Sequence, residues 1–366
     1  MTGRDLRILM TVDAIGGVWQ YATDLAAELV RFGNDMLLAV LGPTPSAAQL
    51  QGAEAAGIRI AETGLALDWL AEDAAPVREA AERIAALAAL HRADVIHCNS
   101  PALAGAAHFG IPTLTVAHGC VTTWWQAARD EPLPPAYHWH RDLVGRGLRA
   151  AERVAAPSHS YARLLQQTYG LRSIPNVIHN GRKASAAAGA NNDMARHALT
   201  VGRLWDDVKG ARILDDAAAL IDVPFLAAGA VQGPQGQLFA ASHLRLLGQL
   251  GDHDLAEQLA ARPVFVSAAT FEPFGLSVLE AAQAGCALIL SDIAIFRELW
   301  EGAAIFVDPS DPAQFAETLS LLMSDDARRA ELGRAAGERA RRFTVERMAR
   351  DTAALYASLC GARQAA

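Results

Sequence analysis

Residues 6–42 read LRILMTVDAIGGVWQYATDLAAELVRFGNDMLLAVLG, and the pattern in this stretch decides the fold. Two continuous apolar runs, 6–12 and 36–42, enclose a segment with apolar residues at helical spacing, followed by Gly33, which suits a helix C-terminus. Apolar runs that do not alternate with polar residues and are joined through a helix are typical of parallel strands covered on both faces. The stretch therefore predicts a strand–helix–strand unit of a doubly wound α/β domain.

The same alternation continues along the rest of the chain. Further strand-like runs in the first half lie at 94–98, 113–117 and 153–157. Residues 182–197 are small, polar and weakly patterned, as in a linker. A second series of strand-like runs follows at 198–202, 223–229, 243–248, 263–267, 286–290 and 303–307. We expect two Rossmann-like, doubly wound parallel-sheet domains that face a cleft.

The linker sets the expected domain boundaries. The first domain is predicted at 1–182 and the second at 183–345, with a C-terminal helix at 346–366 that can cross back to the first domain. The last 45 residues or so are helical and rich in arginine, but acids are interspersed among the basic residues. This pattern is typical of a solvated helix face.

Composition excludes several classes of protein. The chain has 366 residues, enough for two cores, and its net charge of −8 argues against a general nucleic-acid binder. No apolar run approaches the roughly 20 residues that a membrane-spanning helix needs, and the N-terminus does not resemble a signal peptide. The four cysteines form no Cys-x-x-Cys pair, so neither a zinc site nor a disulfide framework is indicated. We expect a cytoplasmic protein with reduced thiols.

The stretch VGRLWDDVKGARIL, 201–214, predicts an anion site. A strand is expected to end at Gly202, and Arg203 and Lys209 flank an acidic turn before a helix. Two cations beside the free N–H groups of a helix N-terminus attract anions, and a diphosphate fits such a site. The alternative interpretation is an ordinary surface turn with an Arg–Asp ion pair.

The stretch FEPFGLSVLEAAQAG, 271–285, places one acid before a turn and another inside a helix. The helix is expected from about Phe274, and Gly275 removes a side chain where a ligand can approach the backbone. Glu280 lies among apolar residues and needs a partner. The arrangement suits a ligand with phosphates between two sets of hydroxyls, with Glu280 binding a ribose diol and Glu272 a sugar. A helix-surface ion pair is the alternative for Glu280.

These two stretches resemble a known family. EPFGLSVLE, 272–280, is similar to the E-x7-E signature of retaining GT-B glycosyltransferases, in particular glycosyltransferase family 4, and VGRLWDDVKG, 201–210, resembles its G-R-L…K-G diphosphate motif. Gly16 and Gly17 after the first strand resemble its N-terminal glycine loop. TLTVAHG, 113–119, places His118 where these enzymes often carry a histidine near the transferred sugar. The likeness spans nearly the whole chain, although SAATF precedes Glu272 where Pro-Ser is more usual.

The resemblance implies a retaining transfer of a sugar from a nucleotide-diphosphate sugar to a carbohydrate, lipid-linked or small-molecule acceptor, as in polysaccharide biosynthesis. It implies that no metal and no further cofactor are needed, because positive charge on the protein stabilises the leaving diphosphate. The catalytic residues implied are His118, Arg203, Lys209 and Glu272. The donor-binding residues implied are Gly16, Gly17, Arg203, Lys209, Glu272, Phe274, Gly275, Leu276 and Glu280.

Aromatic residues are concentrated in 121–143, where Trp124, Trp125 and Tyr137 offer flat apolar faces that suit sugar rings. Together with Trp19 they are candidate acceptor-binding residues, and a loop that packs on its own domain is an equal alternative. Four arginines lie at roughly helical spacing nearby: Arg141, Arg146, Arg149 and Arg153. Weak peripheral contact with a membrane is compatible with this spacing, although neighbouring acids dilute the charge.

Three other functions stay open on the sequence alone. A GT-B-shaped nucleotide-sugar epimerase would rearrange a donor without an acceptor. A non-catalytic sugar-nucleotide-binding protein is disfavoured because the charged residues and His118 occur together. An NAD-dependent dehydrogenase is disfavoured because no G-x-G-x-x-G follows the first strand. His97 and Cys98 are expected in the core or lining the cleft, and His138 and His140 lack further ligands for a metal.

Overall fold

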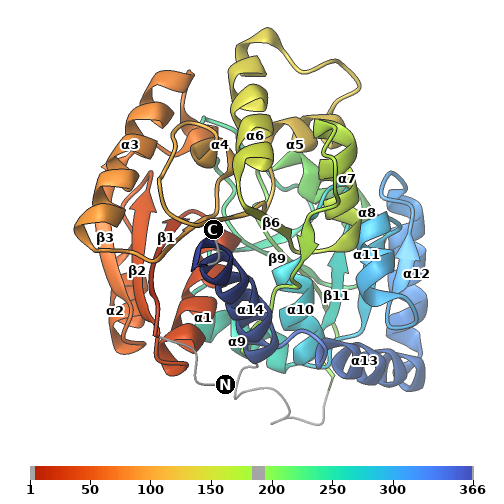
Figure 1. The fold of residues 1–366 in the computed structure, drawn as a ribbon. Coiled ribbons are helices and arrows are strands. Elements are labelled where there is room, and N and C mark those ends of the chain that lie inside the picture. Colours follow the sequence, from red (N-terminus) through yellow and green to blue (C-terminus); the bar gives the residue numbers. More distant parts are fainter. Residues whose placement is uncertain (1–4, 184–193, 365–366) are drawn as a thin grey trace. The chain divides into compact units, whose positions relative to one another are not determined.

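A computed structural model describes residues 5–183 and 194–364, and Figure 1 shows its ribbon. The chain divides into two compact units. The first unit consists of residues 1–181 together with 345–366, and the second consists of residues 182–344. Most of the linker predicted at 182–197 lies outside the described residues.

The first unit contains a seven-stranded parallel sheet in the order β3-β2-β1-β4-β5-β6-β7. Its strands are β1 (Arg7–Asp13), β2 (Asp35–Leu41), β3 (Arg59–Leu65), β4 (Val95–Cys98), β5 (Thr113–Val116), β6 (Arg153–Ala156) and β7 (Asn176–Val177). Its α-helices are α1 (Gly17–Arg31), α2 (Ala47–Ala55), α3 (Ala74–Leu90), α4 (Pro101–Ala104), α5 (Val121–Ala128), α6 (His138–Ala150), α7 (His159–Tyr169) and α14 (Val345–Gln364). The five predicted strands of this unit are confirmed. The two edge strands, β3 and β7, were not predicted.

The helix α14 packs on α1 in the first unit (Figure 1). Met348 and Tyr356 of α14 are buried in the same cluster as Leu25 and Leu29 of α1. The α1 helix ends as its sequence predicts, with Gly33 at a positive φ of 95°. The chain after the second unit therefore returns to complete the core of the first.

Two glycines allow α4 and α6 to pack backbone to backbone. A Cβ atom on Gly147 would lie 1.9 Å from the carbonyl oxygen of Pro101, and one on Gly105 would lie 2.0 Å from that of Leu143. Both distances are far below van der Waals contact, and the obstructing atoms are backbone. A side chain at either position would therefore push the two helices apart.

Replacing Gly147 by alanine should destabilise the first unit by about 3 kcal/mol, because the added methyl group overpacks a backbone contact. Urea denaturation followed by tryptophan fluorescence measures this loss. The matched control is Gly52→Ala in α2, where an added Cβ meets nothing within 4 Å. Equal unfolding midpoints for the two variants would contradict the packing described.

The second unit contains a six-stranded parallel sheet in the order β10-β9-β8-β11-β12-β13. Its strands are β8 (Ala198–Val201), β9 (Phe225–Ala228), β10 (Arg245–Gly248), β11 (Val264–Ser267), β12 (Leu288–Ser291) and β13 (Ile305–Val307). Its α-helices are α8 (Ala211–Ala218), α9 (Asp252–Ala260), α10 (Leu276–Gln283), α11 (Ala294–Trp300), α12 (Pro312–Ser324) and α13 (Asp326–Ala340). Val264 and Val266 belong to the core cluster that contains residues of α8 and α12, whereas Phe265 belongs to the one that contains residues of α10 and α11. Helices therefore cover both faces of the sheet, as predicted.

The connection between β9 and β10, residues 229–244, contains no helix. It is fixed instead by Asp215 of α8, whose carboxylate accepts hydrogen bonds from the backbone N–H groups of Ser242, His243 and Leu244 at 2.8–3.1 Å. Burial favours the neutral carboxyl, but these N–H donors outweigh burial and hold the pKa of Asp215 below its ordinary value of 3.8. The ionised side chain thus takes the place of a covering helix in this connection.

Candidate functional site

Each sheet has a point where the strand order reverses, between β1 and β4 in the first unit and between β8 and β11 in the second. Ligands of doubly wound sheets bind beyond the carboxyl ends of the strands at such points. The predicted site residues of the second unit follow β8 and β11, and His118 of the first unit follows β5. The topology therefore places the predicted residues of the second unit where ligand sites form in this class of sheet, whereas His118 lies one strand away from the reversal in its own sheet.

The turn after β8 contains the Arg–Asp ion pair that the alternative interpretation of this stretch describes. Arg203 donates to the carboxylate of Asp206 at 2.7 Å, and the side chain of Asp206 is 2% exposed. Gly210 follows with φ of 69°, and a Cβ atom there would lie 2.2 Å from the carbonyl oxygen of Ala268. Glycine is therefore required where the chain turns into α8 and passes the end of β11.

Lys209 and Glu272 meet, although 63 positions separate them in the sequence. The ammonium nitrogen of Lys209 lies 2.5 Å from a carboxylate oxygen of Glu272, and both side chains are about one-fifth exposed. The exposure leaves the pair open to a ligand, while the partial burial strengthens its electrostatic interactions. The two sequence motifs thus form one charged site in the second unit.

The helix after Glu272 begins later than predicted. The sequence interpretation starts it at about Phe274, whereas α10 begins at Leu276. Gly275 precedes it with φ of 89°, a left-handed conformation that only glycine adopts readily. The ring of Phe274 is buried and packs edge-on against the ring of Phe343, with ring centroids 5.5 Å apart. The helix N-terminus is therefore formed by the N–H groups from Leu276 onward, and Phe274 holds the turn by packing.

Glu280 has a partner that sequence reasoning missed. The Nε of Arg182 donates to Glu280 at 2.7 Å, and the side chain of Gln283 donates to the carbonyl oxygen of Arg182 at 2.9 Å. The arginine and the glutamate are 14% and 18% exposed. The sequence indicated that Glu280 needs a partner, but nothing local pointed to a residue 98 positions earlier, at the first position of the second unit.

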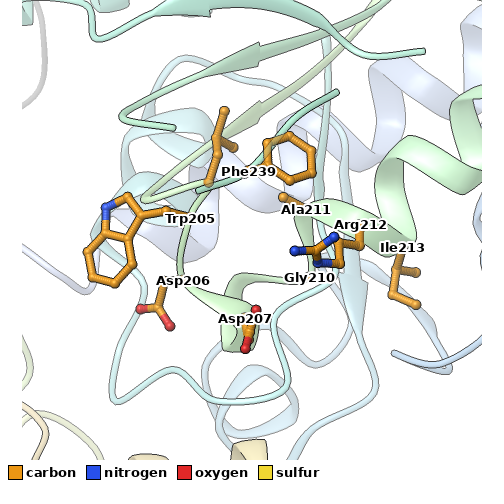
Figure 2. Close-up of a pocket in the computed structure, with 9 residues that line it drawn as sticks. Trp205, Asp206, Asp207, Gly210, Ala211, Arg212, Ile213 and Phe239 are labelled. Atoms are coloured by element: carbon orange, nitrogen blue, oxygen red, sulfur yellow. The ribbon is translucent and has the colours of Figure 1, made fainter. Parts of the chain in front are cut away.

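A cavity of about 360 Å³ opens beside the turn after β8 (Figure 2). Figure 2 shows an indole and a phenyl ring, together with charged side chains, around it. The lining residues are Leu204, Trp205, Asp206, Asp207, Gly210, Ala211, Arg212, Ile213 and Phe239. The guanidinium carbon of Arg203 lies 5.5 Å from the centre of the Trp205 ring, so cation–π attraction helps to orient this arginine.

His118 lies at the carboxyl end of β5 in the first unit and is partly exposed. Its Nε2 is 2.9 Å from the side-chain oxygen of Asn99, and its ring packs edge-on against Tyr21 with centroids 4.3 Å apart. Burial lowers the pKa of His118 to about 3. The imidazole is therefore neutral at physiological pH. Gly16 and Gly17 lie at the start of α1, where Gly16 is the N-cap.

The aromatic residues proposed for the acceptor differ in exposure. Trp124, Trp125 and Tyr137 are half-buried, and the rings of Trp125 and Tyr137 lie 6.0 Å apart. Arg129 lies 5.2 Å from the Trp124 ring centre. Trp19, by contrast, is 5% exposed within the core of the first unit. Its indole packs in this core, and its burial argues against the predicted contact between Trp19 and an acceptor.

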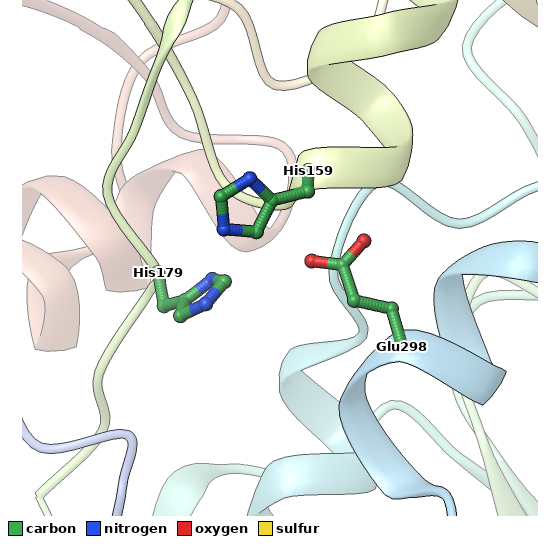
Figure 3. A group of neighbouring side chains, drawn as sticks. All are labelled: His159, His179 and Glu298. Carbon is green, nitrogen blue, oxygen red and sulfur yellow. The ribbon is translucent and has the colours of Figure 1, made fainter.

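The histidines singled out by the sequence do not gather into a metal site within the described residues. His140 contacts Asp68 at 2.8 Å, His138 contacts the carbonyl oxygen of Leu133, and His97 lies in the core. Another pair, His159 and His179, stacks edge to face with ring centroids 5.9 Å apart (Figure 3). Glu298, also drawn in Figure 3, is a residue of the second unit.

Two findings bear on contact with a membrane. None of the helices within the described residues is long and apolar enough to cross a bilayer. Of the arginines near α6, Arg141 pairs with Asp142 at 2.9 Å and Arg149 donates to the carbonyl oxygen of Tyr169. These contacts engage two of the four arginines. Peripheral membrane contact stays a prediction.

Comparison with known proteins supports the resemblance seen in the sequence. Residues 15–185 match the family described as Glycosyltransferase Family 4, and residues 195–325 match the family described as Glycosyl transferases group 1. Phosphatidyl-myo-inositol mannosyltransferase of Mycobacterium tuberculosis is 26% identical over 294 residues, which covers 73% of this chain and 74% of that protein. The D-rhamnosyltransferase WbpZ of Pseudomonas aeruginosa is 28% identical over 225 residues, covering 56% of this chain and 58% of that protein.

Solved structures show the same fold. Sucrose-phosphate synthase from Thermosynechococcus elongatus superposes with a TM-score of 0.77 at 19% identity and covers 98% of this chain and 100% of that one. Anabaena Alr3699/HepE in complex with UDP-glucose gives a TM-score of 0.74 at 19% identity, with 96% and 100% covered. The chain is therefore a glycosyltransferase with the GT-B fold, and it belongs to glycosyltransferase family 4 and the glycosyl transferases of group 1.

Proposed function

We propose that the chain transfers a hexose from a nucleotide-diphosphate sugar to a carbohydrate or glycolipid acceptor, with retention of anomeric configuration and without a metal ion. The observation that carries the proposal is the contact between Lys209 and Glu272, which brings a phosphate-binding cation and a sugar-binding acid to one place. The names of the mycobacterial relatives, which specify mannose and a phosphatidylinositol acceptor, favour a mannosyl donor and a glycolipid. The complex of Alr3699/HepE with UDP-glucose favours a nucleotide-diphosphate sugar as the donor.

The donor is held chiefly by the second unit. Arg203 and Lys209 bind the diphosphate, and the free N–H groups at the start of α10 add the positive end of the helix dipole. Gly275 lets the diphosphate approach the backbone. Glu272 accepts hydrogen bonds from hydroxyls of the transferred sugar. The first unit supplies Gly16, Gly17 and His118, together with the exposed faces of the acceptor-binding aromatic residues Trp124, Trp125 and Tyr137.

The chemistry consists of one bond exchange at the anomeric carbon. The bond from this carbon to the diphosphate oxygen breaks, and a bond to the acceptor oxygen forms on the same face of the sugar. The proton of the acceptor hydroxyl passes to the departing phosphate oxygen. The two cations stabilise the negative charge that develops on the diphosphate. A divalent metal ion has this role in other enzymes.

Arg182 should contribute to donor binding through Glu280. We expect Glu280→Gln to weaken nucleoside-diphosphate affinity about tenfold, because the amide is a poorer acceptor for two ribose hydroxyls. Arg182→Ala should weaken it similarly, since the carboxylate then loses the donor that orients it. Calorimetry of the single and double variants measures the coupling between the two positions. If Arg182 acts only through its contact with Glu280, the double variant should bind the nucleoside diphosphate as tightly as Glu280→Gln does. If the losses of affinity in the two single variants add up in the double variant, this role of Arg182 is contradicted.

A transfer assay tests the function itself. The purified chain is incubated in chelator-containing buffer with GDP-mannose or UDP-glucose and with phosphatidylinositol or free mannose as acceptor. We expect a glycosylated product whose anomeric configuration, read by NMR coupling constants, equals that of the donor. An inverted product, or activity that requires added divalent metal, contradicts the proposed mechanism. An isomerised sugar nucleotide formed without any acceptor would instead show an epimerase.

A further inference from the structure

A buried polar network lies at the carboxyl ends of β1, β4 and β5 in the first unit. Thr11 belongs to β1, His97 to β4, and Asn99 follows β4 directly. His118 follows β5. The sheet order reverses between β1 and β4, so the network lies at the ligand-binding edge of this sheet.

The orientation of the Asn99 side chain follows from its contacts with β1. Its Nδ2 lies 2.8 Å from the carbonyl oxygen of Thr11, and its backbone N–H donates to the Thr11 hydroxyl at 3.1 Å. A backbone carbonyl only accepts hydrogen bonds, so the amide NH₂ group must face Thr11. The amide oxygen of Asn99 therefore faces the opposite way, toward the two histidines.

This oxygen fixes the proton positions on both imidazoles. It lies 2.9 Å from Nε2 of His118 and 3.1 Å from Nε2 of His97. An amide oxygen only accepts, so Nε2 of each histidine carries a hydrogen atom. Burial lowers the pKa of both rings to about 3, and in His97 the neighbouring His118 lowers it further. Both rings are neutral, and Nδ1 of each is a bare acceptor.

The C-terminal helix completes the network. The hydroxyl of Tyr356, from α14, lies 2.6 Å from Nδ1 of His97 and donates to it. Tyr356 and His97 are both fully buried, so this hydrogen bond is shielded from water. Tyr21 packs its ring against His118 and brings its hydroxyl within 3.4 Å of Nε2 of His97. Every contact agrees with the same pair of tautomers.

His118 differs from His97 at its second nitrogen. Among the described residues nothing hydrogen-bonds to Nδ1 of His118, and the ring is partly exposed, whereas His97 is 0% exposed. A bare imidazole nitrogen accepts a hydrogen bond from a hydroxyl. Asn99 contacts this ring at Nε2. This contact leaves Nδ1 available for a ligand.

We propose that Asn99 is a positioning residue that locks His118 as the Nε2–H tautomer, so that its Nδ1 accepts a hydrogen bond from a hydroxyl of the transferred sugar, and that Tyr356 supports Asn99 indirectly by fixing His97. The part concerning the sugar rests on the proposed function, whereas the tautomer is a property of the protein alone. A neutral acceptor also places no positive charge beside the anomeric carbon, where positive charge develops during transfer. Tyr356, His97 and Asn99 thus connect the helix α14 to His118.

NMR of the ligand-free protein with ¹⁵N-labelled histidine tests the tautomer directly. His118→Gln and His97→Gln identify the two sets of resonances. We expect each ring to show a protonated Nε2 and a bare Nδ1, with no titration between pH 5 and pH 8. A protonated Nδ1 on His118 overturns the inference. This result does not depend on any nucleotide, so it stands apart from the outcome of the transfer assay.

Two variants test the positioning role. In Asn99→Asp the carboxylate should make His118 titrate near neutral pH, because a negative charge favours the protonated ring. Affinity for UDP-glucose or GDP-mannose, whichever binds, should fall about tenfold at pH 6 with no change for UDP or GDP, because only the sugar contacts His118. Tyr356→Phe should disturb the His97 resonances, whereas Tyr161→Phe, a buried tyrosine outside the network, should not. Equal losses for nucleotide and nucleotide sugar, or unchanged histidine spectra in both network variants, contradict the proposal.

Discussion

Replacing Lys209 by alanine is expected to reduce the rate of sugar transfer about 10²–10³-fold, the loss typical of removing one preorganised charge from a developing anion. The ammonium group is fixed by Glu272 at 2.5 Å and lies beside the turn into α8, so it needs little reorganisation when the diphosphate leaves. Arginine at this position should restore only part of the rate, because a planar guanidinium does not fit a site made for a compact charge. Initial rates of nucleotide release at saturating donor measure the effect.

The chain supplies a matched control for this variant. Lys183 is the only other lysine in the sequence, and it is exposed one residue after Arg182. Lys183→Ala changes the net charge by the same amount and should leave the rate within twofold. If Lys209→Ala also keeps its rate within twofold, this ammonium does not stabilise the leaving group, and the diphosphate site must be placed elsewhere.

The second large effect concerns Glu272 and separates sugar binding from diphosphate binding. Glu272→Gln keeps the size of the side chain but removes the charge that neutralises Lys209 in the empty site. Transfer should fall about 10²-fold or more, because the sugar loses an ionised acceptor for its hydroxyls. Affinity for the nucleoside diphosphate alone should rise about fivefold, since roughly 1 kcal/mol of competing attraction disappears.

Calorimetry with the nucleoside diphosphate and rate measurements with the nucleotide sugar record the two opposite effects. Glu331→Gln serves as control, because Glu331 forms an exposed ion pair with Arg328 away from the site. A parallel loss of affinity and rate in Glu272→Gln would mean that the acid only holds Lys209 in place. An unchanged rate would remove Glu272 from the mechanism altogether.

The sequence allowed the central strands and the two charged motifs to be predicted for physical reasons. Strands buried on both faces must be continuously apolar, and the central strands of both sheets follow this rule. The predicted edge strand β10 also formed, although most of its residues are exposed. The edge strand β3, RIAETGL, has no fully buried residue, is exposed at Arg59, Glu62 and Gly64, and carries a glycine, so its sequence resembles a loop. The helix α10 was placed two residues early, because the left-handed turn at Gly275 depends on tertiary packing of Phe274.

The parts of the site that could not be predicted depend on long-range contacts. Arg182 lies in a stretch that reads as a turn and linker, and only the folded chain brings it to Glu280. Asn99 follows a buried strand with no motif of its own, yet its amide joins β1, β4 and β5. Tyr356 lies 259 residues from His97. Partners at such separations follow from the topology of the sheet and from the return of α14, which local patterns do not encode.

The most direct test of the account is calorimetric titration of the full chain with UDP, GDP, ADP and TDP in chelator-containing buffer, before and after the double substitution Arg203→Ala/Lys209→Ala. We predict that at least one nucleoside diphosphate binds the unmodified chain without metal, that its affinity falls as salt is raised, and that the double variant loses at least 100-fold in affinity. The same affinity in both proteins, or binding that appears only with a divalent cation, would contradict the claim that these two side chains hold the diphosphate.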